Sequence, residues 1–300
     1  MDILDMRILS RLLNNCRESD RQIGIELGVS GGAVRARIRK MEELKIIEEF
    51  FIKVEPPVLG YGVLYIVVSG EDINEILEQV SLIGEPNFVV PCIGGITVCS
   101  IVVKENLQQK IELANKLMKD VRVLSIFEAE NPGFISNLTK TDLEILEELI
   151  KNPRQKIERI AKNTNMSTKT ITRCIEKLHD NEGIQFTVNY NPKKIYDFIP
   201  YAVLAWIDGN LKETLNNLNN TFTESYLQIP FIAKNQIVLF MYSNSIFEMD
   251  ELTQKVRTVK NVKSADLFIP KKISFFNKWL DKAIMDYKKS SKLHLFYQTN

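Results

Sequence analysis

The chain has 300 residues and a mass of 34.6 kDa, more than one hydrophobic core usually organises, so two or more domains are expected. Its composition, 45% hydrophobic and 26% charged, is that of a globular protein and excludes a wholly disordered or collagen-like chain. The 39 basic and 38 acidic residues nearly cancel, so any affinity for phosphate must come from local patches.

The low histidine and cysteine content limits the chemistry that the chain can carry. Two histidines and four cysteines without CxxC spacing predict no metal site and no cofactor, because a zinc cluster needs four N or S ligands close together. We interpret the cysteines as small core side chains of a cytoplasmic protein. Asp2 and Asp5 stand where a signal peptide would be positive, and no apolar run approaches the ~20 residues of a membrane span, so no membrane association is expected.

The first repeat opens with three predicted helices. Residues 8–13 carry an apolar stripe at helical spacing, a short second helix follows at 21–27, and a glycine-valine turn leads into the third. Ser30 is placed to cap that third helix, which we expect to end near Leu44. The next segment, 46–54, alternates loosely and predicts a β wing. Three short helices, a tight turn and a β ribbon are typical of a winged helix-turn-helix domain.

Most of the chain repeats this pattern once. A shift of 137 residues aligns 5–47 with 142–184, and eleven of these 43 positions are identical, where chance would give about three. The identical pairs are Asp5/Asp142, Ile8/Ile145, Leu9/Leu146, Leu12/Leu149, Asn15/Asn152, Arg17/Arg154, Ile23/Ile160, Ser30/Ser167, Ile38/Ile175, Lys40/Lys177 and Ile47/Ile184. Most are apolar positions or helix caps, so a core pattern is repeated, and we expect a second winged helix-turn-helix domain.

The remainder of each repeat predicts the order β-α-β-β-α-β. In the first copy the elements are expected at 62–69, 73–83, 87–92, 96–103, 107–118 and 121–130. In the second copy they are expected at 201–207, 211–221, 225–231, 236–242, 247–258 and 262–269. This order is typical of a ferredoxin-like domain, in which both helices cover one face of an antiparallel sheet. The other face is apolar and needs a partner.

The last thirty residues are basic and amphipathic. They hold seven lysines and two aspartates, a local charge of +5. Apolar residues at helical spacing predict a helix packed on the body with its lysines outward; they are Ile273, Phe276, Leu280, Ile284 and Tyr287. Such a helix could brace a head, add a phosphate contact, or cover apolar surface, and we favour the cover.

The motifs of the first repeat resemble the leucine-responsive/asparagine-regulator (Lrp/AsnC) family of prokaryotic transcription factors. They are LDMRILSRLLNNCRES, LGVS, AVRARIRKMEELKII and the following Leu59-Gly60-Tyr61. The resemblance extends from residue 4 to about 130, and again from 141 to about 270. It implies a helix-turn-helix that binds DNA and a ferredoxin-like domain that forms dimers and often senses an amino acid. One copy of each is usual in that family, so this chain resembles a dimer joined in one polypeptide.

The predicted fold class is therefore α+β, with two copies of a winged helix-turn-helix followed by a ferredoxin-like βαββαβ domain, plus a C-terminal helix. The expected domains are winged helix-turn-helix at 1–56 and 133–192, ferredoxin-like at 57–132 and 193–270, and the basic helix and tail at 271–300. Asn131-Pro132-Gly133 would begin the link between repeats. We expect the two sheets to pair within the chain, at an effective concentration of order mM; pairing between chains only is the alternative.

Positive charge concentrates on the third helix of the first copy, where residues 30–40 hold four cations and no acid. With Val34 toward the core, the helical period turns Gly32, Ala36, Arg39 and Lys40 outward, and Arg37 lies nearer the core edge. Arginine can contact phosphate or pair with guanine. The predicted DNA-binding residues of this copy are Ser30, Gly31, Gly32, Arg35, Arg37, Arg39 and Lys40. The alternative is a solvated basic helix face.

The second copy offers fewer cations for DNA. Glu176 stands where Arg39 stands in the first, and a carboxylate facing DNA lowers affinity unless it accepts from cytosine. The predicted DNA-binding residues here are Ser167, Thr168, Lys169, Thr172 and Arg173. We therefore expect the first copy to dominate binding, with the second adding positioning or protein contact.

The predicted function is a cytoplasmic, sequence-specific transcriptional regulator that binds double-stranded DNA and is not an enzyme. One alternative is an enzyme resembling the sirohaem decarboxylases, which share this architecture but use histidines in the sheet; here His179 ends a helix and His294 lies in the tail. The other is a co-regulator whose heads bind protein. An effector stays undefined, because Gly94-Gly95 keeps the family's glycines without its acidic residue. Further self-association through the ferredoxin-like domains stays open.

Overall fold

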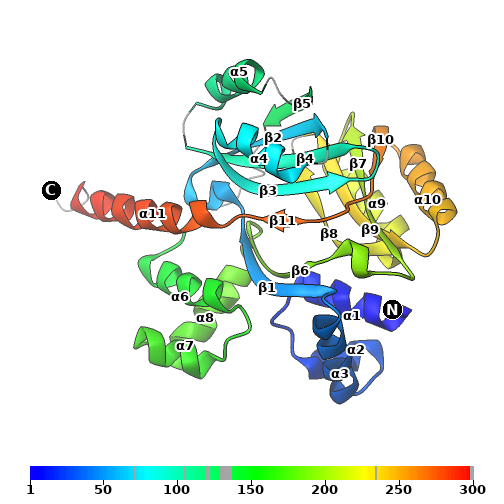
Figure 1. The fold of residues 1–300 in the computed structure, drawn as a ribbon. Coiled ribbons are helices and arrows are strands. Elements are labelled where there is room, and N and C mark those ends of the chain that lie inside the picture. Colours follow the sequence, from blue (N-terminus) through cyan, green and yellow to red (C-terminus); the bar gives the residue numbers. More distant parts are fainter. Residues whose placement is uncertain (71, 105, 119–121, 129–136, 234, 298–300) are drawn as a thin grey trace.

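The computed structural model describes residues 1–297 except 71, 105, 119–121, 129–136 and 234, and it is an α+β molecule with two helical heads beneath two sheets (Figure 1). The expected link at 131–133 lies outside the described residues. Head 1 comprises α1 (Ile3–Asn14), α2 (Asp20–Leu27) and α3 (Gly31–Glu43). Head 2 comprises α6 (Lys140–Lys151), α7 (Ile157–Thr164) and α8 (Thr168–His179).

The helices of both heads begin at the caps that the sequence indicates. Ser30 accepts a hydrogen bond from the backbone N of Ala33 at 3.1 Å, and Ser167 accepts one from Thr170 at the same distance. Each satisfies a helix donor that has no partner within its own helix. Gly28 ends α2 with φ 71°, a left-handed conformation that suits glycine. The third helix of each copy is confirmed.

The strand after each third helix does not fold back on its own head. β1 (Ile47–Val54) pairs antiparallel with β6 (Ile184–Tyr190), and the register runs from Ile47 opposite Tyr190 to Val54 opposite Ile184. Short 3-10 turns follow, η1 (Pro56–Leu59) and η2 (Pro192–Lys194), whose prolines lack the N–H that a continuing strand would donate. The wing expected in each head is thus one ribbon built from both.

This ribbon joins the two heads into one hydrophobic core. The buried residues of this core include side chains of α1 to α3, both ribbon strands, α6 to α8 and the C-terminal helix. The carbonyl of Leu13, near the end of α1, accepts hydrogen bonds from Thr187 Oγ1 at 2.8 Å and Gln185 Nε2 at 3.1 Å. Side chains of β6 therefore satisfy a helix terminus of head 1, so head 1 depends on the second repeat.

The two ferredoxin-like units each form an antiparallel sheet in the expected order. The first sheet runs β11-β3-β4-β2-β5 and the second β10-β7-β9-β8. The first unit consists of β2 (Gly62–Ser69), α4 (Ile73–Ser81), β3 (Glu85–Cys92), β4 (Ile96–Val103), α5 (Leu107–Leu117) and β5 (Arg122–Glu128). The second consists of β7 (Ile199–Ile207), α9 (Leu211–Phe222), η3 (Thr223–Ser225), β8 (Tyr226–Ala233), β9 (Gln236–Ser243), α10 (Ile246–Thr258) and β10 (Val262–Phe268).

The sheets contact each other through the faces that their helices leave open. In β2, Leu64, Ile66 and Val68 belong to the core beneath α4 and α5, and the alternate residue Tyr65 points the other way. The Tyr65 ring stacks on Phe127 of the same sheet at 5.2 Å between centroids, and it lies 6.2 Å from Phe231 of the second sheet. The sheets therefore meet within one chain.

The C-terminal segment departs from the expected single helix. Residues 274–275 form β11 (Ser274–Phe275), which adds to the edge of β3, with Phe276 N donating to Asn87 O at 2.8 Å. The helix α11 (Lys278–Tyr297) begins only afterwards. An open strand edge presents unpaired donors and acceptors, and this segment satisfies part of it. The prediction that Ile273 and Phe276 lie on the helix was wrong, because the chain around them pairs with the edge of β3 before the helix begins.

The helix α11 joins the first sheet to head 2. Trp279, Leu280, Ala283 and Ile284 are buried in the core shared by the heads. Lys288 pairs with Glu147 of α6 at 2.8 Å, and Asp286 accepts from Tyr61 and Lys104 at the base of the first sheet. No helix of the described residues combines the length and the apolar character that crossing a bilayer requires.

Phe186 tests whether the heads share one core. Its side chain, on β6, is 1% exposed, so Phe186→Ala should lower the free energy of unfolding by about 3–4 kcal/mol. Hydrogen–deuterium exchange should then show weaker amide protection in α1 as well as in α6. The control Phe247→Ala, at a ring 76% exposed, should cost less than about 0.5 kcal/mol. Loss of protection confined to head 2 would contradict a shared core.

Candidate DNA-binding surface

The outer face of α3 carries three exposed cations of head 1. Arg35 and Arg39 have side chains 78% and 79% exposed, and Lys40 is exposed beside them. On the opposite face, Val34, Ile38 and Met41 are buried in the head. The helical period thus separates a core face from a cationic face, as the sequence predicted.

Both exposed arginines are paired with acidic residues in the free protein. Arg35 Nε donates to Asp20 Oδ2 at 2.8 Å, at the first turn of α2. Arg39 Nε donates to Glu43 Oε1 at 2.9 Å, one turn along the same helix. Ion pairs with one such exposed partner contribute about 0–1 kcal/mol, so a phosphate can displace either carboxylate at small cost.

Arg37 lies apart from this exposed pair. Its Nη1 donates to Asp2 Oδ2 and to Asp5 Oδ1, both at 2.7 Å, and its side chain is 31% exposed. The bonds to Asp5 and Asp2 raise the pKa of the Arg37 guanidinium. The pKa of Asp2 is lowered, first by the Asp5 backbone N–H and then by Arg37. These contacts tie α3 to the start of α1, so Arg37 supports the head.

The glycines at the start of α3 have different surroundings. A Cβ on Gly31 would lie 3.1 Å from the Cα of Arg21, so this glycine allows the close approach of α2 and α3. A Cβ on Gly32 would meet only Ser30 Oγ, at 3.8 Å, and the residue is exposed. Gly32 therefore leaves the end of the helix open to a backbone approaching from outside, and Gly31 has a packing role.

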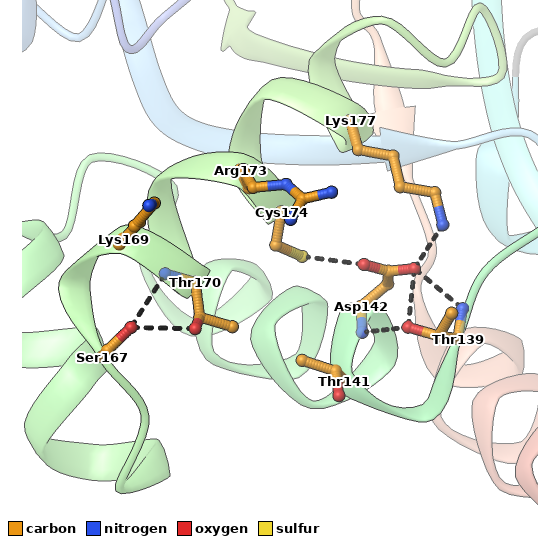
Figure 2. A pocket seen from close by; sticks show the side chains of 9 residues that line it. All are labelled: Thr139, Thr141, Asp142, Ser167, Lys169, Thr170, Arg173, Cys174 and Lys177. Carbon is orange, nitrogen blue, oxygen red and sulfur yellow. Dashed lines mark hydrogen bonds and ion pairs between the residues drawn. The ribbon is translucent and has the colours of Figure 1, made fainter.

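Head 2 has a hollow of about 350 Å³ between α8 and the start of α6 (Figure 2). Lys169 and Arg173 are exposed on its α8 side. Thr168 is exposed at the first turn, and its carbonyl accepts from Thr172 Oγ1 at 3.0 Å. The predicted residues of this head therefore surround one end of α8, with the Thr172 hydroxyl already bonded to its own helix.

The floor of this hollow is a buried carboxylate, Asp142, whose partners Figure 2 shows converging on it. Lys177 Nζ donates to it at 2.6 Å, Thr139 Oγ1 at 2.8 Å and Cys174 Sγ at 3.2 Å. Burial alone would raise the pKa of Asp142, but these hydrogen bonds outweigh burial and lower it. Burial, and then Asp142, raise the pKa of the Cys174 thiol, which therefore stays protonated.

The two heads hold the same carboxylate with different cations. Asp5 and Asp142 are equivalent in the repeat; Arg37 binds the first, while Lys177 binds the second because Cys174 occupies the Arg37 position. Our sequence reasoning missed this exchange. The signal was present, since of these three positions the repeat keeps the aspartate and the lysine at position 40 and replaces the arginine.

His179 and the four cysteines lie in structural surroundings. The His179 ring, at the end of α8, lies 6.3 Å from the Phe186 ring and so belongs to head 2. All four cysteines are free and buried, which confirms their reading as core side chains. The side chain of His294 lies outside the described residues.

Comparison with known proteins agrees with this geometry. Residues 1–42 match the AsnC-type helix-turn-helix domain, and residues 138–184 match the winged helix-turn-helix DNA-binding domain. The HTH-type transcriptional regulator Ptr1 of Methanocaldococcus jannaschii is 35% identical over 88 residues, 28% of this chain and 60% of that protein. An uncharacterized HTH-type transcriptional regulator of Pyrococcus horikoshii is 27% identical over 149 residues, 48% of this chain and 97% of that protein.

A solved structure described as the siroheme decarboxylase NirDL covers 97% of this chain and is itself covered completely. Its TM-score is 0.48 and its identity 12%, a likeness too low to say anything of activity. The two matched domains place the chain among helix-turn-helix proteins of the DNA-binding class. The first of these domains is similar to the AsnC type, and the relatives above, each matched over less than half of this chain, are named as HTH-type transcriptional regulators.

Lys177→Met tests the ion pair that holds Asp142. The carboxylate would stay buried without its cation, so the free energy of unfolding at pH 7 should fall by about 2 kcal/mol. The lowered pKa of Asp142 stabilises the fold above the unfolded value of about 3.9, and this contribution is lost as the pH falls through the folded pKa. The difference between the native chain and the variant should therefore shrink below about pH 4.

The matched control is Lys169→Met, at an exposed lysine of the same helix. Denaturant unfolding of both variants between pH 3 and pH 7 gives the comparison. Lys169→Met should change the free energy of unfolding by less than about 0.5 kcal/mol at either pH. An equal loss for Lys177→Met at pH 3 and pH 7 would assign its effect to packing and not to charge.

Proposed function

We propose that the chain is a sequence-specific, DNA-binding transcriptional regulator of the Lrp/AsnC type, built as a pseudo-dimer in one polypeptide. The observation that carries the proposal is the face of α3, where Arg35, Arg39 and Lys40 are exposed on a capped third helix. In a helix-turn-helix domain this helix enters the major groove, and arginine there reads guanine or binds phosphate. The partner is double-stranded DNA.

Head 1 dominates the proposed binding. Its two exposed arginines exchange a weak intramolecular carboxylate for a phosphate or a base. Head 2 presents Lys169 and Arg173, but Glu176 is exposed at the position of Arg39 and repels phosphate. Head 2 therefore binds a second half-site more weakly and adds orientation, with Ser167 and Thr168 at the end of α8 nearest the DNA.

The chain's proposed role needs no chemistry of its own. We place it in the cytoplasm, because a regulator of prokaryotic genes works where the DNA is. Its effector, if one binds, is not an amino acid recognised through the 94–97 hairpin, which has no acidic residue for an amino group. Association of further chains through the ferredoxin-like units is compatible with this role.

Salt-dependent DNA binding tests the ranking of the heads. Arg35→Ala with Arg39→Ala should lower affinity and reduce the slope of log affinity against log salt by about 2, because two phosphate-neutralising groups are lost. Lys169→Ala with Arg173→Ala should have the smaller effect. The measurement is fluorescence anisotropy on a genomic site found by binding-site mapping. A larger loss from the head 2 pair would reverse the ranking.

Incubation with sirohaem tests the enzymatic alternative. We expect no decarboxylated product by mass spectrometry, since His179 lies in head 2 and the 89–92 and 228–231 strands carry no histidine. A product formed catalytically would overturn the non-enzymatic role. A chain that retained its fold but enriched no DNA would instead favour the co-regulator, whose heads bind protein.

A further inference from the structure

An arginine from each repeat crosses to the opposite head. Arg17 and Arg154 are equivalent in the internal repeat, and so are Asn15 and Asn152, although core packing explains neither identity. In both copies the asparagine Oδ1 accepts from the arginine backbone N at 3.0 Å. The same turn therefore aims both arginines after the first helix of each head.

Arg17 binds the loop that precedes α7. Its Nη1 donates to the carbonyls of Pro153 and Gln155, the second at 3.1 Å. Both acceptor residues are buried. A guanidinium that binds two backbone carbonyls fixes the direction of approach as well as the distance, because its donors lie in one plane.

Arg154 makes the return contact with head 1. Its Nη2 donates to Asp20 Oδ1 at 3.3 Å, and its guanidinium lies over the Phe50 ring, 4.8 Å from the centroid. The other oxygen of Asp20 accepts from Arg35, on the recognition helix. Head 2 is thus connected through one carboxylate, 14% exposed, to the arginine proposed to contact DNA.

We propose that Arg17 and Arg154 form a clasp that fixes the spacing and rotation of the two recognition helices, and so selects the spacing of the two DNA half-sites. This rests on the proposed function. The β1–β6 ribbon has only two strands, and apolar packing around it is not directional, so neither by itself sets the rotation of one head against the other. The clasp adds side-chain contacts at the turns after α1 and α6, beside the ribbon, and these contacts oppose rotation of one head against the other.

The geometry of DNA makes such a constraint selective. Successive major-groove sites lie ~34 Å apart, and one added base pair shifts a half-site by ~3.4 Å and turns it by about a tenth of a full rotation. Heads that cannot rotate cannot follow this change. Arg154 has a second effect: when Arg35 moves to DNA, Arg154 still neutralises Asp20, which would otherwise repel phosphate.

Selection of binding sites from random-sequence duplex DNA tests the clasp. The native chain should enrich two half-sites at one spacing, whereas Arg17→Gln with Arg154→Gln should enrich a broader range of spacings. On duplexes altered by one base pair, the native chain should lose about tenfold in affinity and the variant clearly less. Enrichment of the same single spacing by both proteins, or of single half-sites by the native chain, would overturn the clasp.

The matched control is Arg159→Gln, at an exposed arginine of α7 in the same head, which should leave the selected spacing unchanged. Arg154→Lys keeps the charge but not the planar group over Phe50, and it should broaden the spacing in the same direction if the double variant fails to fold. Broadening by Arg159→Gln equal to that of the clasp variants would overturn the proposal.

A measurement without DNA separates the clasp from the proposed function. Spin labels at Glu42→Cys and Asp180→Cys, at exposed ends of α3 and α8, report the distance between the two helices, since the native cysteines are buried. The distance distribution should be narrow in the native chain and broader in the clasp variant. Equal widths would overturn the clasp. Equal failure to enrich any DNA, with unequal widths, would overturn the proposed function alone.

Discussion

The pairing of β1 with β6 is the constraint on which the rest of the molecule depends. Among the described residues neither strand pairs with any other strand, so each of the two strands finds its ladder partner in the other repeat. A lone two-stranded ribbon is marginal in water, and here residues such as Phe51 and Phe186 are buried between the heads and the sheets. Each head is therefore completed by the other repeat, within a single chain.

Within this shared frame, the heads have become unlike at their surfaces and have stayed alike in their interiors. The aspartate near the start of the first helix is kept in both, as is a cation from the third helix that binds it. In head 2 the cation is Lys177, one turn further along the helix. The smaller Cys174 stands at the arginine position, beside the hollow along α8. The two heads thus differ at this position, arginine in one and cysteine in the other, while the buried carboxylate stays paired in both.

The sequence could predict the features that depend on neighbouring residues. Caps such as Ser30 and Ser167, and the apolar stripes of the helices, act within one or two turns, so periodicity revealed them and the structure agrees. The shared ribbon, the edge strand β11 and the fixed position of Arg37 depend on residues far apart in the chain. Local patterning describes a strand at 47–54, but it cannot say which strand lies beside it.

The near-zero net charge has a physical consequence for binding. In the free protein Arg35 and Arg39 are each paired with a carboxylate, so head 1 attracts random DNA less than the four cations of residues 30–40 suggest. A head that binds weakly gains most from a second head on the same molecule, because the second contact becomes intramolecular. That gain exists only when both heads can reach their sites together. The low affinity of each single head makes tight binding require both half-sites. A rigid connection between the heads makes it require those half-sites at one spacing, so both features make affinity depend on how sites are arranged along the DNA.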